Sequence, residues 1–202
     1  MIVDSAALAS METRYRAAFV NSLSGFKAAN LVGTCDEFGH HNLAIMSSTV
    51  HIGSNPPLLA LVMRPEAAGQ HTLQNILSQK YYTLNHVHAG ICEAAHQTAA
   101  RYPREVSEFQ AVGLTAVSLE AFPAPFVGES RLRLGMALRD HQVLQINQTH
   151  FVIGEILLAD VPENIVDEGG GVDIAAADTV ALSGLDSYHA TERIARLPYA
   201  KP

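Results

Sequence analysis

The feature that most constrains the fold of this chain is a series of short apolar runs separated by turn residues. Residues 28–35, 42–50 and 58–63 have the length and pattern of strands. An Asp-Glu-Phe-Gly turn at residues 36–39 and a Ser-Asn-Pro-Pro breaker at residues 54–57 separate the three runs. Because short turns join antiparallel neighbours, the sequence predicts an antiparallel meander in this region.

The rest of the chain continues this pattern, with helices as interruptions. Further strands are predicted over residues 81–87, 115–119, 130–147 and 151–159. Helices are predicted over residues 11–23, 72–78 and 90–102. These helices do not alternate regularly with the strands, which disfavours a doubly wound parallel sheet. We expect a single domain over residues 1–202, mainly β (α+β) in class, built as an antiparallel barrel with short helical insertions and an irregular tail over about 183–202.

Composition and charge exclude several classes of partner. The formal net charge of −7 argues against the clustered basic face that nucleic-acid binding requires. It also argues against binding to anionic membrane surfaces. No apolar window approaches the ~18 residues of a membrane span, and the N-terminus lacks the segments of a signal peptide. The two cysteines are far apart, so we expect a cytoplasmic protein without disulfides. Only 16% of the residues are charged, which favours some surface being buried against a partner subunit.

Several common catalytic motifs are absent from the sequence. It contains no glycine-rich dinucleotide fingerprint, no P-loop and no Gly-x-Ser-x-Gly elbow. One partial metal pattern remains, because His86 and His88 would point to the same face of a strand and Glu93 follows five residues later. This resembles part of the cupin pattern, although the other cupin elements are missing. A cupin-like metal enzyme is therefore an alternative, against histidines that only form hydrogen bonds.

The most informative polar residues lie between residues 39 and 72. Ser47, Ser48 and Thr49 place three hydroxyl groups in succession on a predicted strand. Buried hydroxyls need hydrogen-bond partners, so this segment is either a ligand-binding strand or a Ser/Thr-rich edge strand. Arg64 ends the next apolar strand, shortly before the helix that opens at Gln-His-Thr (70–72). An arginine beside the free amides of a helix N-terminus is suited to a phosphate group.

The order of these motifs resembles the flavin-reductase-like, FMN-binding split-barrel family. The shared features are a turn glycine at Gly39, Asn-x-Ala at 42–44, the Ser-Ser strand, and Pro-Pro before an apolar strand. The family's Lys-Asp-Thr-x-x-Asn-Ile helix start corresponds to Gln-His-Thr-Leu-Gln-Asn-Ile at residues 70–76, and its Val-Asn strand end to Leu-Asn at 84–85. Residues 151–156 resemble a late barrel strand, and residues 183–188 a C-terminal Gly-Gly-x-x-Tyr element with one glycine replaced.

The resemblance implies an FMN-binding split barrel that forms a homodimer, with the flavin at the subunit interface. FMN, or alternatively FAD, would do the redox chemistry itself, so no catalytic side chain is expected. The implied cofactor-binding residues, in chain order, are Met46, Ser47, Ser48, Thr49, Met63, Arg64, His71, Thr72, Asn75, Asn85 and Tyr188. Of these, His71 and Thr72 would receive the phosphate.

Two functions follow from the resemblance. The first is an oxidoreductase, either an NAD(P)H-dependent flavin reductase or an FMN-dependent reductase of a small molecule. The second is a flavin-binding electron carrier that serves a partner oxidoreductase and has no substrate site of its own. The chain departs from the family where Gln70-His71 replaces Lys-Asp. A protonated His71 would stand in for the lysine, and phosphate binding would then weaken as the pH rises.

Overall fold

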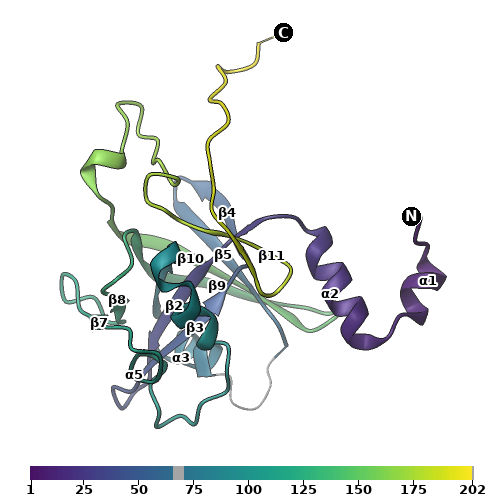
Figure 1. Ribbon diagram of the computed structural model, residues 1–202. Coiled ribbons are helices and arrows are strands. Elements are labelled where there is room, and N and C mark those ends of the chain that lie inside the picture. The colour runs from purple at the N-terminus through teal and green to yellow at the C-terminus, as the bar shows by residue number, and fades with distance from the viewer. Residues whose placement is uncertain (66–70, 202) are drawn as a thin grey trace.

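A computed structural model of the protein describes residues 1–65 and 71–201, and its largest feature is a seven-stranded antiparallel sheet (Figure 1). The strands follow the order β3-β2-β6-β9-β10-β5-β4 across the sheet. Their bounds are β2 Asn30–Cys35, β3 His41–Met46, β4 Thr49–Ser54, β5 Pro57–Met63, β6 Tyr81–His86, β9 Arg133–Leu144 and β10 Thr149–Asp160. The strand-rich, antiparallel class predicted from the sequence is therefore confirmed.

Smaller elements surround this sheet. Strands β1 (Lys27–Ala28), β11 (Ala181–Ser183) and β12 (Ser187–His189) form a second sheet, and β7 (Ala116–Val117) pairs with β8 (Phe126–Val127). The helices are α1 Ser5–Ser10, α2 Thr13–Leu23, α3 His71–Gln79, α4 Cys92–Gln97 and α5 Glu108–Val112, with short 3-10 turns at Ala89–Ile91 and Glu163–Ile165. The β11–β12 hairpin corrects the prediction of an irregular tail from residue 183, since the tail without helix or strand begins only at residue 190.

The predicted meander is wrong in one respect, because β3 and β4 lie at opposite edges of the large sheet. The predicted strand over residues 42–50 is interrupted at Ser47 and Ser48. Met46 still pairs with Asn30 of β2, whereas the carbonyl of Ser48 already accepts the N–H of Val62 in β5 at 3.0 Å. The chain therefore changes from one edge of the sheet to the other within two residues.

This crossing requires the sheet to curl. Seven strands in a flat sheet would separate the two edges by about 29 Å. The link from Met46 to Thr49 contains three Cα–Cα steps and spans at most about 11 Å. The edge strands must therefore approach each other at this end, as they do in a barrel.

The core has two parts, one on each face of β2. Val32 packs with Leu61, Tyr82 and Met136 in one cluster, and Leu31 packs with Phe109 in the other. Neighbouring residues of a strand point to opposite faces, so a strand that is covered on both faces is buried along its length. This explains why five of the six residues of β2 are buried.

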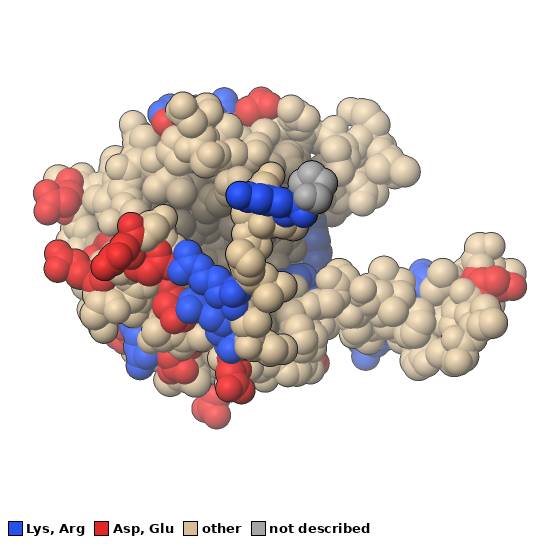
Figure 2. Space-filling view, turned by 90° about the horizontal axis from the view of Figure 1, so that it is seen from above, with Lys and Arg blue, Asp and Glu red and all other residues tan. Residues whose placement is uncertain are grey.

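One predicted helix is longer than the helix observed. The segment predicted as a helix over residues 90–102 is helical only to Gln97, because the hydroxyl of Thr98 binds the carbonyl of Ala95 and also accepts an N–H from β3. At the N-terminus, α2 matches the prediction closely, and α1 precedes it. None of the residues of α1 and α2 is buried. Both helices project from the body of the protein in two perpendicular views (Figures 1 and 2).

Among the described residues, no helix is long and apolar enough to cross a bilayer.

Candidate functional site

A cavity of about 450 Å³ lies beside β3 and receives residues from several distant segments. This volume is in the range of small-molecule sites. Its walls come from β3 and the two residues after it, the end of β5, the start of α3, the turn after α4 and the β11–β12 hairpin. The predicted site residues that line it are Met46, Ser47, Ser48, Met63, Arg64, His71, Thr72 and Tyr188.

The break after β3 places Ser47 and Ser48 at this cavity. Both residues are half-buried, and within the described chain neither hydroxyl has a hydrogen-bond partner. A half-buried hydroxyl without a protein partner is available to a ligand. Thr49, the third hydroxyl of the predicted series, does not line the cavity, and its Oγ1 accepts a hydrogen bond from the Asn30 amide at 3.3 Å.

Helix α3 brings His71 and Thr72 to the cavity at its N-terminus. The first amides of a helix have no partner within the helix and so favour an anion. Thr72 is buried, and its hydroxyl accepts the amide of Asn42 at 3.0 Å. The Nε2 atom of His71 is buried and has no partner among the described residues. Gln70, the other half of the family's Lys-Asp position, lies outside the described residues.

Two of the predicted site residues lie in the interior rather than at the cavity. The Asn75 amide donates to the Thr34 hydroxyl at 3.1 Å, at the back of the α3 start. Asn85 is fully buried and accepts the Val127 N–H through Oδ1, while its amide donates to the Leu31 carbonyl. Both side chains satisfy buried polar groups: Asn75 joins α3 to β2, and Asn85 joins β6 to β2 and β8.

Tyr188 enters the cavity from the opposite side, on β12. Its ring packs edge-on against His96 at 5.8 Å between centroids, and its hydroxyl lies 3.2 Å from Nδ1 of the same histidine. Burial raises the pKa of Tyr188 to about 12, so the phenol stays protonated. It is therefore available as a hydrogen-bond donor at neutral pH.

The sequence did not identify one wall of the cavity. Strand β3 is an edge strand, and side chains rather than another strand occupy its free amides. The Leu43 N–H donates to Glu108 Oε2 at 2.9 Å, and the Ile45 N–H donates to Thr98 Oγ1 at 2.9 Å. Glu108, Thr98 and the nearby Arg101 line the cavity. They lie 50 or more residues from β3, and no local motif marks them.

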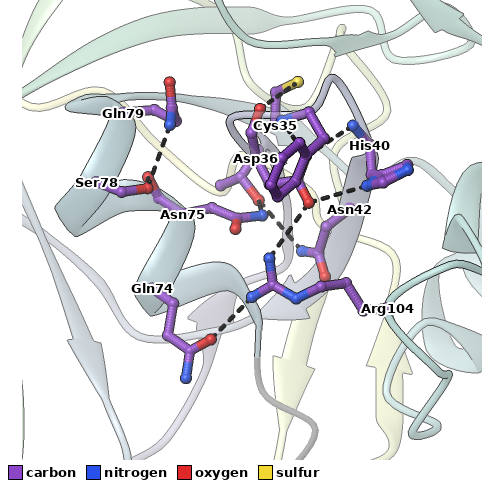
Figure 3. Close-up of polar contacts among 11 residues, drawn as sticks. Cys35, Asp36, His40, Asn42, Gln74, Asn75, Ser78, Gln79 and Arg104 are labelled. Carbon is purple, nitrogen blue, oxygen red and sulfur yellow. Dashed lines mark hydrogen bonds and ion pairs between the residues drawn. The ribbon is translucent and has the colours of Figure 1, made fainter.

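A polar network joins the turn after β2, the start of α3 and the segment before α5 (Figure 3). The carboxylate of Asp36 contacts Arg104 Nη1 at 3.2 Å and His40 Nδ1 at 3.0 Å, and it also accepts the N–H groups of Phe38 and His40. Burial alone would raise the pKa of Asp36, but the hydrogen bonds from His40 and Phe38 outweigh it and hold the pKa at about 2. Arg104 Nη2 also donates a hydrogen bond to Gln74 Oε1 at 2.9 Å, which joins the segment before α5 to α3.

The histidines of the partial metal pattern have other contacts. His86 Nδ1 lies 3.2 Å from the Thr179 hydroxyl, and burial lowers the pKa of His86 to about 4. His88 Nε2 lies 3.0 Å from the carbonyl oxygen of Glu129, while Glu93 is exposed on α4. Across residues 1–65 and 71–201, no group of three His, Cys, Asp or Glu side chains is arranged to hold a metal ion. The cupin-like alternative therefore has no geometric support in the described chain.

Comparison with known proteins gives one family match. The model of the "Flavin reductase like domain" family matches residues 23–176 of this chain. Among solved structures, a Shewanella frigidimarina NCIMB 400 protein assigned as a flavin reductase with a split barrel domain is 52% identical, with a TM-score of 0.96, over 99% of this chain and 100% of that one.

Two more distant structures share the fold. Nitrilotriacetate monooxygenase component B from Bacillus cereus is 18% identical, with a TM-score of 0.84, over 98% of each chain. An FMN-binding protein from Thermus thermophilus, solved with bound 1-cyclohex-2-enone, is 16% identical, with a TM-score of 0.69, over 86% of this chain and 90% of that one. The antiparallel split-barrel class predicted from the sequence is thus confirmed.

Proposed function

This chain belongs to the flavin reductase-like domain family, and from that premise we propose that it is an FMN-binding oxidoreductase that takes electrons from NADH or NADPH. The observation that carries the proposal is the shared cavity of about 450 Å³. It combines the free hydroxyls of Ser47 and Ser48 with the helix opening at His71 and Thr72, although 22 residues lie between the two segments in the sequence.

The residues present fit a phosphorylated flavin. Unpartnered polar atoms at Ser47, Ser48 and His71 match a ligand that has both a polar ring edge and an anionic end. Met46 and Met63 add apolar, polarisable surface that suits an aromatic ring. When bound, the flavin would supply the hydride and electron transfer, which no protein side chain performs.

In this proposal the side chains bind and orient, and they exclude water. The hydroxyls of Ser47 and Ser48 and the phenol of Tyr188 donate hydrogen bonds to the ring or the ribityl chain. Arg64, together with the amides at the start of α3, receives the phosphate. The second substrate, a small molecule or a nicotinamide, would approach from the open side of the cavity.

We also propose a homodimer with the flavin at the subunit interface. The N-terminal arm, defined here as residues 1–24, has no buried residue in either of its helices. Its apolar side chains include Tyr15, Val20 and Leu23, which are all at least half exposed. Exposed apolar surface of this kind marks a protein contact, and a second copy of the chain would cover it. Cys35 and Cys92 are free thiols, which suits the reducing cytoplasm that we propose as its location.

The experiment that tests this function begins with an absorbance spectrum of the purified protein. FMN is then titrated, and NADH or NADPH oxidation is followed with FMN present. We expect flavin binding and steady-state turnover. Bound flavin without turnover unless a partner oxidoreductase is added would assign the protein as an electron carrier instead. A protein that never binds FMN would refute both functions.

A further inference from the structure

Glu108 is a buried carboxyl group at the end of the cavity where the phosphate is proposed to bind. It begins α5, is only 6% exposed, and lines the main cavity next to His71. Its Oε2 accepts the Leu43 N–H at 2.9 Å. Within the described residues, it has no salt bridge to an arginine or a lysine, because the nearby Arg104 pairs with Asp36.

Glu108 also faces a second, smaller cavity of about 10 Å³ on the other side of the same wall. This is about the space of one water molecule. The titratable and charged groups around this small cavity are Asp36, His40, His41, His71 and Arg104. Around the main cavity they are Arg64, His71, His96, Arg101 and Tyr188. Glu108 and His71 are the titratable groups common to both.

This setting shifts the protonation equilibrium of Glu108 towards the neutral form. Burial raises the pKa of Glu108, while the hydrogen bond from Leu43 and the proximity of His71 act in the opposite direction. A buried carboxylate that lacks a full ion pair is costly to keep charged.

A bound phosphate would make the charged form less favourable still. A phosphate monoester carries a charge of about −1.5 to −2 at pH 7. Two anions that share a partly buried site repel each other, so one of them takes up a proton. A carboxylate beside a phosphate would weaken binding, whereas a neutral carboxylic acid could donate a hydrogen bond to it.

We propose that Glu108 takes up a proton when FMN binds and then donates its O–H to the phosphate group. One proton leaves the solvent, one O–H bond forms on the carboxyl group, and no electrons move. Glu108 would thus be a specificity residue that recognises the phosphorylated flavin in its protonated form. This inference rests on the proposed function, since it assumes that the phosphate lies at the His71 end of the cavity.

The test counts the protons that accompany binding. Isothermal titration calorimetry of the full-length protein near pH 7, in buffers of different ionisation enthalpy, gives the number of protons taken up with FMN and with riboflavin, which lacks the phosphate. We expect net uptake with FMN and none with riboflavin. Because the complex holds a proton that the free protein lacks, the affinity for FMN falls by up to about tenfold per pH unit as the pH rises.

Variants identify the group that takes up the proton. Glu108→Gln keeps a carbonyl oxygen for the Leu43 N–H but cannot titrate, so we expect it to bind FMN without this proton uptake and with a weaker pH dependence. His71→Asn tests the other titratable group common to both cavities, and we expect it to retain the uptake. Glu129→Gln is the matched control, because the Glu129 carboxylate also accepts a backbone N–H, that of Thr115 at 3.1 Å, but does not line the cavity.

Every other outcome contradicts the proposal that Glu108 takes up the proton. Uptake that persists in Glu108→Gln and disappears in His71→Asn assigns the proton to His71, and uptake that persists in both assigns it to the phosphate. Equal uptake with riboflavin removes the phosphate from the explanation. If Glu108→Gln does not fold, infrared difference spectra of the wild type with FMN and with riboflavin decide, since only FMN should produce a new carboxylic-acid band. Failure of the wild type to bind any flavin would instead refute the proposed function.

Discussion

At the scale of single residues, what matters most in this protein is whether a polar side chain has a partner. Asn75 and Asn85 resemble family site residues in the sequence, but the structure satisfies both internally. Ser47, Ser48 and His71 keep unpartnered polar atoms at the cavity within the described chain. A sequence gives the residue type but not the partner, because the partner comes from another element.

Arg64 gives the first prediction at this scale. Arg64→Ala removes a proposed charge-assisted contact with the phosphate, which is worth roughly 1.5–3 kcal/mol, or about ten- to a hundred-fold in the dissociation constant. The side chain is exposed, so the melting temperature of the apoprotein should hardly change. Fluorescence titration with FMN measures the effect. Arg131→Ala, which removes another exposed arginine, is the control, and unchanged affinity in Arg64→Ala would remove Arg64 from the site.

Asp36 gives a prediction about acid stability. Its pKa in the folded protein is about 2, below the ordinary value of 3.8. The carboxylate therefore stabilises the fold above about pH 4, and that stability is lost as the pH falls from about 4 towards 2. Asp36→Asn should cost on the order of 1–3 kcal/mol at pH 7, because it weakens hydrogen bonds to a charged group. Urea unfolding at pH 7 and towards pH 2 measures this effect. The difference in the free energy of unfolding between variant and wild type should become smaller in acid. A difference that does not change with pH would contradict the stabilising role of the Asp36 carboxylate.

At the scale of elements, the large sheet requires a glycine at position 33, because the backbone at Pro125 approaches β2 closely there. Gly33 lies on β2, where a Cβ atom would be 2.3 Å from the carbonyl oxygen of Pro125 and 2.5 Å from the Thr83 hydroxyl. Both neighbours are fixed, since that hydroxyl donates to the same carbonyl at 2.7 Å. The segment before β8 therefore packs directly on β2 and covers its outer face.

The prediction at this scale is that Gly33→Ala destabilises the protein. The added methyl group must displace a backbone carbonyl, which typically costs about 1–3 kcal/mol. Gly53→Ala is the matched control, because the nearest atom to a Cβ there is 3.5 Å away, an ordinary contact. Thermal unfolding should show a lower melting temperature for Gly33→Ala than for Gly53→Ala. Equal melting temperatures would mean that the segment before β8 moves aside without cost.

At the scale of the whole molecule, the N-terminal arm stands apart from the rest. The base of the arm is attached to the β11–β12 hairpin, since Lys27 Nζ contacts the carbonyl oxygens of Asn21 and Gly184 at 3.3 and 3.1 Å. Beyond this point the arm projects away from the body (Figure 2). A helix with no tertiary contact is marginal in water when it is this short. The arm therefore needs another surface to be stable, and a second copy of the chain is our proposal.

Deletion of residues 1–24 tests that proposal. We expect the truncated protein to elute as a monomer, or to dissociate at a concentration at least about tenfold higher than the full chain does, because it loses apolar contact area. Analytical ultracentrifugation of both forms measures the dissociation constant. Replacing only the exposed Tyr15 and Leu23 by serine keeps the chain length and should shift the equilibrium in the same direction. A full-length chain that is a monomer at all concentrations would refute the dimer.

The sequence by itself determined most strands of the large sheet, although it did not separate β4 from β3 or predict the β11–β12 hairpin, and it identified two of the segments that meet at the cavity. Alternation, turn residues and the opening of α3 are local properties, so the residues around Ser47 and Thr72 could be recognised without a structure. Only the tertiary structure decided that β3 and β4 take opposite edges of the sheet. It also decided that Glu108, Thr98 and Arg101 close the cavity from more than 50 residues away. Those choices depend on how a curved sheet pairs its edges, and nothing within a short window of sequence encodes that pairing.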